Sequence, residues 1–338
     1  MRPNSRTLAV HQGKGATRQA ARLAAVMEAL ECHAAETLDL PLRLASPAEM
    51  GARGVAVERL PRAAGSADPH GARLLWVAGQ DLLGGGTLYV PRELVAADWA
   101  LPLPPASGFF QASTNGLGAG FAREQALSHA LLEVIERDAM ALWRAGTQSA
   151  RRLDPDRVPG EAGALIAHLR RRDAWVALWD VSSDIGVPVV LAALGDETGR
   201  RQPELGAAAD PDGERAVWRA LAEAAQSRLT VISGARDDFA PADYQPAQRQ
   251  GWADTLRQQP AEGAWPFPPA AAHRHGATRS ELILAALARA GFDQAVCVDL
   301  SPPGLEAVVV RVVVPGLEGG HTGPEGEYSP GSRAGGRR

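Results

Sequence analysis

Residues 113–138 read STNGLGAGFAREQALSHALLEVIERD. The stretch opens with a glycine-rich segment, residues 113–120, which we interpret as a loop. The alanines and leucines that follow predict a helix over residues 122–145. Glu133 and Glu136 are three positions apart and therefore project from one side of this helix, among apolar neighbours. Because a buried carboxylate needs a cation or hydrogen-bond donors, the stretch predicts a helix that serves a polar site.

Two further predicted helices, over residues 17–36 and 214–232, carry polar side chains at the same kind of spacing. These side chains are Glu28 and Glu31 on the first helix and Arg219, Glu223 and Gln226 on the second. A single pair of glutamates three positions apart is usually a solvated helix face. The recurrence of the pattern on separate helices weakens that interpretation and favours a functional site.

Strands are predicted between and after these helices. They cover residues 6–11, 54–60, 73–79, 87–90, 174–181, 187–193, 294–300 and 307–314, with a further helix over residues 279–290 and a long loop over residues 239–277. This mixture, without an obvious linker, predicts an α+β (mixed α/β) fold in one domain over residues 1–318. Glycine and proline predominate in residues 319–338, which we predict to be a flexible tail.

The composition excludes several classes of protein. The chain has 338 residues, 45% hydrophobic and 22% charged, which is an ordinary globular mixture. The net charge of −4 argues against a protein built to bind nucleic acid. No apolar run reaches the roughly 18 residues of a membrane span. Cys32 and Cys297 are too few for a disulfide framework or a four-cysteine zinc site. We therefore expect a cytoplasmic protein that contacts neither nucleic acid nor membrane.

The polar residues favour magnesium over transition metals. Carboxylates without companion cysteines or Glu-x-x-His motifs disfavour zinc and di-iron sites. Mg²⁺ instead binds one or two carboxylates together with substrate phosphates. Arg137, Arg228 and Arg236 are then candidates for bidentate contacts with phosphate oxygens. Lys14, the only lysine of the chain, lies in a Gly-Lys-Gly segment that lacks the spacing of a P-loop.

Taken together and in order, several segments resemble the YcaO family, whose members use ATP to activate the oxygen of a peptide-backbone amide. The segments are residues 13–15, 28–31, 113–120, 133–138, 219–228, 234–238 and 309–318. The resemblance covers nearly the whole chain. The last three segments resemble the branch associated with the protein TfuA, which is linked to the formation of backbone thioamides.

The resemblance implies a YcaO-like fold of β-sheets flanked by helices, with an ATP site between the carboxylate-bearing helices. It implies that Mg²⁺ is bound by Glu28, Glu31, Glu133 and Glu136. It further implies that ATP is bound by Lys14, Glu28, Glu31, Asn115, Arg137, Glu223, Gln226, Arg228 and Arg236. No protein nucleophile is implied, so the catalytic residues stay unassigned.

On this resemblance we expect an ATP-dependent enzyme that forms a thioamide in a ribosomally made precursor peptide, with a TfuA-like protein and a sulfur donor as partners. The first alternative is an azoline-forming cyclodehydratase, although the chain lacks the Pro-x-Pro-x-Pro ending of many such enzymes. The second is a non-catalytic YcaO-like scaffold that docks the peptide. The peptide, the sulfur source and the oligomeric state, a homodimer included, stay open.

Some positions depart from the family pattern. Ala24 stands where the family usually has serine, and Phe121, Ala122 and Gln125 replace its usual asparagine, threonine and glutamate. Relatives also carry an additional segment ahead of the region that begins at Arg2, and that segment contributes to the nucleotide site. We expect that the start codon has been assigned too far downstream. The alternative is a truncated member with impaired activity.

Overall fold

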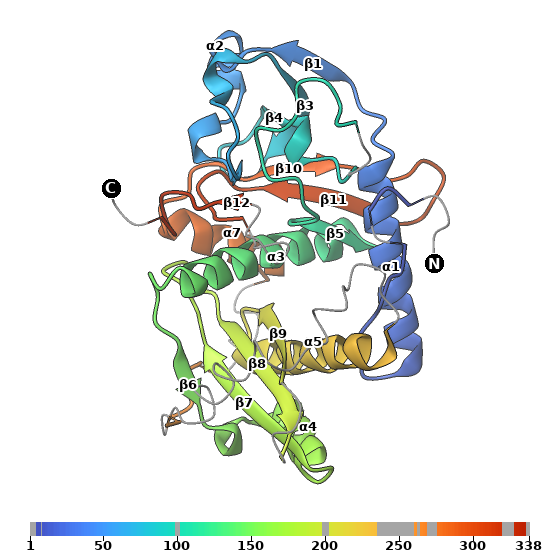
Figure 1. Cartoon of the computed structure of the whole chain (residues 1–338), viewed down its shortest axis with the longest axis vertical. Helices are drawn as coiled ribbons and strands as arrows, with labels where there is room; N and C mark the ends of the chain where they lie inside the picture. Colours follow the sequence, from blue (N-terminus) through green and yellow to red (C-terminus); the bar gives the residue numbers. More distant parts are fainter. Residues whose placement is uncertain are drawn as a thin grey trace. The chain divides into compact units, whose positions relative to one another are not determined.

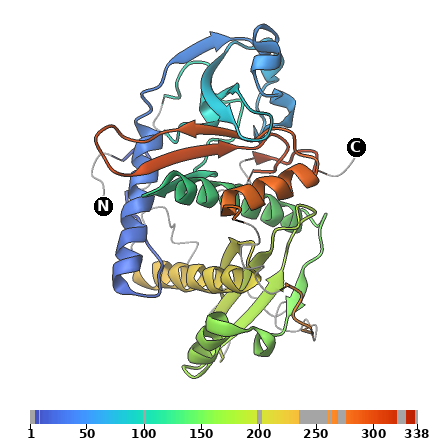
Figure 2. The same cartoon turned by 180° about the vertical axis from the view of Figure 1, so that it is seen from behind.

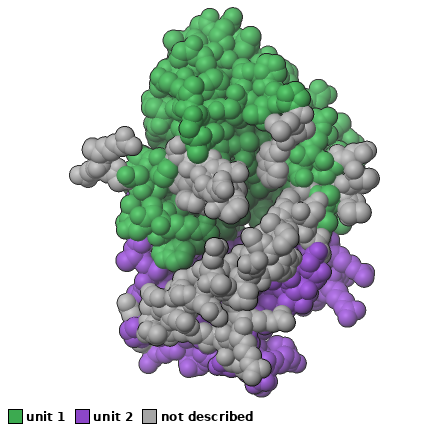
Figure 3. Space-filling view, viewed as in Figure 1, with its two compact units in different colours: residues 1–11, 26–147, 277–338 green, residues 12–25, 148–276 purple. Residues whose placement is uncertain are grey.

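The computed structural model describes residues 5–7, 9–98, 102–197, 203–234, 260–261, 264–268, 276–319 and 328–335. The chain divides into two compact units, which Figure 3 colours separately. Unit 1 comprises Met1–His11, Val26–Thr147 and Ala277–Arg338, and unit 2 comprises Gln12–Ala25 and Gln148–Gly276. One domain over residues 1–318 with a flexible tail over residues 319–338 stays a prediction.

Unit 1 is built on a six-stranded antiparallel sheet (Figure 1). Its strands follow the order β1 (Leu42–Ala45), β3 (Leu74–Asp81), β10 (Val296–Asp299), β11 (Val308–Val313) and β5 (Leu117–Gly120), and β4 (Thr87–Pro91) pairs with β3. β5 therefore ends the strand order, beside β11. Strands from distant parts of the sequence thus share one sheet.

The predicted hairpin of β3 and β4 is confirmed by their antiparallel pairing. The connection passes through Gly85 and Gly86, whose φ angles of 77° and 79° lie in the left-handed region that favours glycine. The strands predicted over residues 294–300 and 307–314 are likewise confirmed, as β10 and β11. Valine dominates both strands, as expected for strands buried inside a sheet.

Helix α3 (Arg123–Arg144) packs along β5 and β11 and confirms the predicted helix (Figure 1). Two glycines of β5 allow this approach. A Cβ atom on Gly118 would lie 2.3 Å from a backbone oxygen of α3, and one on Gly120 would lie 2.6 Å from a side chain of α3. The loop predicted over residues 113–120 is therefore wrong for Leu117–Gly120, an edge strand whose glycines permit close packing.

Unit 1 contains further short elements. They are α2 (Pro47–Met50), α7 (Arg279–Arg289), the ribbon of β2 (Arg62–Ala63) with β12 (Tyr328–Ser329), and the 3₁₀ turns η1 (Gly51–Arg53), η2 (Val57–Arg59), η3 (Pro69–Gly71) and η4 (Arg92–Leu94). Helix α1 (Arg18–Glu36) also confirms its prediction, and Arg18–Ala25 of it are counted in unit 2. Helix α7 packs against α3, as the view from behind shows (Figure 2).

Two predicted strands are wrong. The described part of residues 6–11 contains no strand. In residues 54–60, Gly54 makes an isolated bridge to Tyr89 and the chain then turns into η2. The apolar residues Val55, Val57 and Leu60 are all buried. A turn therefore buries the same side chains that suggested a strand, and the apolar pattern alone does not separate the two.

Unit 2 is a four-stranded antiparallel sheet covered by two helices. The strands β6 (Arg151–Leu153), β7 (Ala174–Asp180), β8 (Val189–Asp196) and β9 (Glu204–Ala209) pair in chain order, η5 (Pro155–Arg157) follows β6, and α4 (Gly160–Arg170) and α5 (Gly213–Ser233) pack on the sheet. Asp212 caps α5 by accepting hydrogen bonds from two backbone N–H groups of its first turn. The predicted β7, β8 and α5 are confirmed.

Most of the predicted loop over residues 239–277 lies outside the described residues. Within the part of the chain that the structure describes, no helix combines the length and the apolar character needed to cross a membrane.

Candidate functional site

Helices α1 and α3 bring carboxylates to unit 1. Glu28 and Glu31 lie on the part of α1 that belongs to this unit, and Glu133 and Glu136 lie on α3. The Oε1 atom of Glu31 accepts a hydrogen bond of 2.6 Å from the backbone N–H of Ala119 in β5. Because β5 ends the strand order, its outer backbone groups are available to a side chain from another element. This contact fastens α1 to the edge of the sheet.

The charges of these residues interact. Burial, followed by the negative charges of Glu133 and Glu28, raises the pKa of Glu31 to about 8, against the lowering effect of the Ala119 hydrogen bond. A pKa raised by neighbouring carboxylates means that the site repels a further negative charge. Glu133 and Glu28 therefore both act electrostatically on Glu31.

Arg137 is a cation beside the α3 carboxylates. Its Nη2 lies 3.8 Å from Glu133 Oε1, and its Nε lies 4.0 Å from Glu136 Oε1. At the other helix, His11 Nδ1 lies 4.0 Å from Glu28 Oε2. The side chain of Arg137 is 42% exposed, so water screens its attraction to the glutamates. We call Glu28, Glu31, Glu133 and Glu136 the carboxylate cluster.

Arg311 is a charged residue in the core of unit 1 that the sequence analysis did not select. It lies on β11, its relative exposure is 2%, and neither Nε nor Nη1 has a hydrogen-bond partner among the described residues. Burial lowers the pKa of Arg311 to about 10, and Glu133 and Cys32 act in the opposite direction. Its signal in the sequence is a single charge inside the apolar run Val308–Val313.

Arg311 and Asn115 line the same cavity of about 30 Å³. Ser113, Gln111 and Glu318 are among the other residues that line it. The Oδ1 atom of Asn115 is buried and has no hydrogen-bond donor among the described residues. A polar cavity of this size has room for water molecules that would satisfy both groups. Asn115, predicted as an ATP contact, therefore lies close to Arg311 in the interior of unit 1.

The remaining predicted ATP contacts belong to unit 2. Lys14 Nζ donates to Glu223 Oε2 at 2.5 Å, and Gln226 Nε2 donates to the carbonyl oxygen of Gln12 at 3.1 Å. These bonds fasten residues 12–14 to α5. Arg228 is half-buried on the same helix. Arg236 lies outside the described residues.

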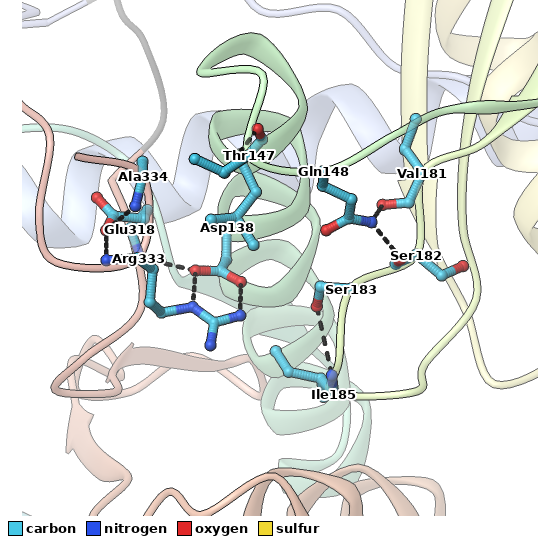
Figure 4. A network of polar contacts seen from close by, with 11 residues as sticks. Asp138, Thr147, Gln148, Val181, Ser182, Ser183, Ile185, Glu318, Arg333 and Ala334 are labelled. Carbon is cyan, nitrogen blue, oxygen red and sulfur yellow. Dashed lines mark hydrogen bonds and ion pairs between the residues drawn. The ribbon is translucent and has the colours of Figure 1, made fainter. Parts of the chain in front are cut away.

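A second charge cluster is built around Asp138 in the C-terminal half of α3 (Figure 4). Asp138 is fully buried and binds the guanidinium of Arg333 through Nε at 3.0 Å and Nη2 at 2.9 Å. It also accepts the backbone N–H of Glu318. The Glu318 carboxylate in turn accepts backbone N–H groups of Gly331, Arg333 and Ala334. Residues 331–334 are therefore tied to the helix that carries Glu133 and Glu136.

The donor chemistry of the carboxylate cluster fits Mg²⁺. Across the described ranges, no three His, Cys, Asp or Glu side chains lie close enough together to hold a metal by themselves. Mg²⁺ does not require such a cage, because it usually keeps waters and substrate phosphates beside one or two carboxylates. After burial, the charges of Glu133 and Glu28 raise the pKa of Glu31, and a cation between these carboxylates would relieve that repulsion.

The fold described above is that of the YcaO class, as comparison with known proteins shows. The family model described as YcaO cyclodehydratase, ATP- and Mg²⁺-binding, matches residues 12–318. The chain therefore belongs to the YcaO family, and the predicted resemblance, mixed α/β fold and use of ATP and Mg²⁺ by the family are confirmed.

Two relatives match almost the entire chain. An uncharacterised protein from the tfuA 3′ region of Rhizobium leguminosarum bv. trifolii is 37% identical, over 94% of this chain and 79% of its own. An uncharacterised protein of Methanothermobacter thermautotrophicus is 34% identical, over 94% of this chain and 84% of its own.

Solved structures share the fold. YcaO from Methanopyrus kandleri, bound with AMPPCP and Mg²⁺, is 29% identical with a TM-score of 0.67, over 90% of this chain and 78% of its own. A heterocyclase in complex with substrate and cofactor is 22% identical with a TM-score of 0.74, over 91% of this chain. This chain spans only 44% of that heterocyclase.

Proposed function

We propose that this protein uses ATP and Mg²⁺ to activate a backbone amide of a ribosomally made precursor peptide, and that the product is a thioamide. The observation that carries the proposal is the carboxylate cluster, where Glu133 and Glu28 help to raise the pKa of Glu31, in a chain of an ATP- and Mg²⁺-binding family. The relative from the tfuA 3′ region supports thioamide formation with a TfuA-like partner.

The chain's own residues would position the reactants. The carboxylate cluster would hold Mg²⁺, and Arg137, beside Glu133 and Glu136, would contact phosphate oxygens. Lys14, Asn115, Glu223, Gln226, Arg228 and Arg236 stay proposed nucleotide contacts. When bound, Mg²⁺-ATP supplies a phosphoryl group that makes the amide oxygen a good leaving group, while a sulfur donor provides the new bond to carbon. Catalysis would consist of positioning and charge stabilisation.

The test is ATP hydrolysis that depends on both peptide and sulfide. Replacing one carboxylate by an isosteric amide removes a metal ligand, so we expect Glu133→Gln and Glu136→Gln each to lower the rate at least tenfold. Glu306→Gln changes an exposed glutamate of unit 1 and serves as the control. Rates equal to wild type in both cluster variants would reject the site.

Azoline formation is the second candidate, supported by the family description as a cyclodehydratase. In that reaction a Cys, Ser or Thr side chain of the peptide attacks the amide. The mass of the product separates the two reactions, because a thioamide exchanges oxygen for sulfur and an azoline loses water. Titration calorimetry with Mg²⁺-ATP separates both from a non-catalytic scaffold, which does not need to bind nucleotide.

A further inference from the structure

The guanidinium of Arg311 is buried, and two of its nitrogens have no hydrogen-bond partner among the described residues. A buried charge is costly unless it is paired and hydrogen-bonded. Within the sheet, Arg311 stands opposite Val298 of β10 and Leu117 of β5, and both are apolar. Arg311 is 2% exposed, and neither its Nε nor its Nη1 has a hydrogen-bond partner among the described residues, so bulk solvent and its sheet partners do little to compensate its charge.

The groups that act on Arg311 come from the two helices of the carboxylate cluster. Glu133 of α3 attracts its charge, and so does the thiol group of Cys32 on α1 when ionised. Glu133 also acts on Glu31, which neighbours Cys32 in the sequence. The carboxylate of Glu133 is therefore attracted by Arg311 and repelled by Glu31.

Resting on the proposed function, we propose that Arg311 is a built-in counter-cation of the carboxylate cluster. In the metal-free protein its buried charge offsets the repulsion between Glu31 and Glu133, and bound Mg²⁺ takes over this task. Arg311 acts through Glu133 and is thus a positioning residue.

Arg311 and Arg137 differ in how strongly they can fulfil this role. The side chain of Arg137 is 42% exposed and is screened by solvent and salt, whereas Arg311, 2% exposed, is screened far less. An interior charge acts through a lower effective dielectric and therefore more strongly at equal distance. A guanidinium also keeps its charge in environments where an ammonium group readily loses its proton.

The experiment compares thermal unfolding midpoints of the full chain at about pH 8.5, in MgCl₂ and in choline chloride of equal ionic strength. For Arg311→Met we expect the unfolding midpoint without Mg²⁺ to be lower than that of wild type. We expect Mg²⁺ to raise this midpoint by at least about twice as much as it raises that of wild type. Arg311→Lys places an ammonium group that loses its proton more readily when buried, so its rise in midpoint should lie between those of wild type and Arg311→Met. Val298→Ala removes packing at the register partner of Arg311 and should lower both midpoints equally.

Each outcome has a defined meaning. The absence of a Mg²⁺-induced rise in wild type would reject the magnesium site itself. A second result is that Mg²⁺ raises the unfolding midpoint of wild type and raises that of Arg311→Met by the same amount or by less. This result would reject the role of Arg311 but not the magnesium site. If Arg311→Met does not fold, the double variant with Glu133→Gln should restore folding, because it removes the opposing charge as well. A Mg²⁺-induced rise in Arg311→Lys that exceeds that of Arg311→Met would overturn the inference, because lysine cannot compensate the carboxylates less than methionine does.

Discussion

At the scale of single residues, Glu31 connects the fold to the proposed chemistry. One oxygen of its side chain accepts the Ala119 N–H of β5, and the carboxylate is repelled by Glu133 and Glu28. The same group thus holds α1 to the sheet and responds to any cation that enters. If Glu31 binds the proposed Mg²⁺, its protonation is coupled to metal binding.

The raised pKa of Glu31 predicts how stability depends on pH. Between the ordinary value of 4.5 and about 8, the folded protein retains a proton that the unfolded chain has released. The stability of the metal-free protein should therefore fall as pH rises through this window. Denaturant unfolding across the window measures the fall, and Glu31→Gln should remove this contribution.

Magnesium should reverse the effect. Below about pH 8, Mg²⁺ must displace the proton of Glu31, so its apparent affinity should rise with pH up to about 8 and then level off. Titration calorimetry in two buffers of different ionisation enthalpy detects the released proton. An equal heat in both buffers at pH 7 would contradict the assignment of Glu31 as a ligand.

At the scale of elements, the contact of β5 with α3 sets where Glu133 and Glu136 lie. Gly118 is essential to this contact, because an added Cβ would lie 2.3 Å from a backbone oxygen of α3. We expect Gly118→Ala to destabilise the protein by about 1–3 kcal/mol, as overpacking does. Gly71→Ala is the matched control, since an added Cβ there meets nothing within 4 Å. Denaturant midpoints of the two variants compare them, and equal values would contradict the packing argument.

The elements show what sequence periodicity can predict. The helices α1, α3 and α5 follow from apolar spacing, and their glutamates were predicted correctly as members of those helices. The strand character of Leu117–Gly120 did not follow, because glycines that permit close packing and glycines that form a loop are the same residues in a sequence. The burial of Arg311 depends on helices far away in the chain, so only its unusual place in an apolar strand was visible.

At the scale of the whole molecule, distant parts of the chain depend on one another through Asp138 and Arg333. Asp138 is fully buried, and Arg333 is 19% exposed. Asp138→Asn leaves the Arg333 charge without its bidentate acceptor, so we expect a loss of about 2–3 kcal/mol. Adding Arg333→Met should recover part of this loss. Denaturant unfolding of the two single variants and the double variant measures the coupling, and strictly additive losses would contradict it.

The placement of β10 and β11 also has a consequence for how the protein is made. These strands lie between β3 and β5 in the sheet. They are synthesised only after the whole of unit 2, which ends at Gly276. Until then the nascent chain carries two strands with open sides, and such edges invite pairing with other chains. The sheet of unit 1 therefore closes late, and Arg311 enters its interior only at that step. A ribosome that stops before residue 308 releases a chain that cannot complete this sheet.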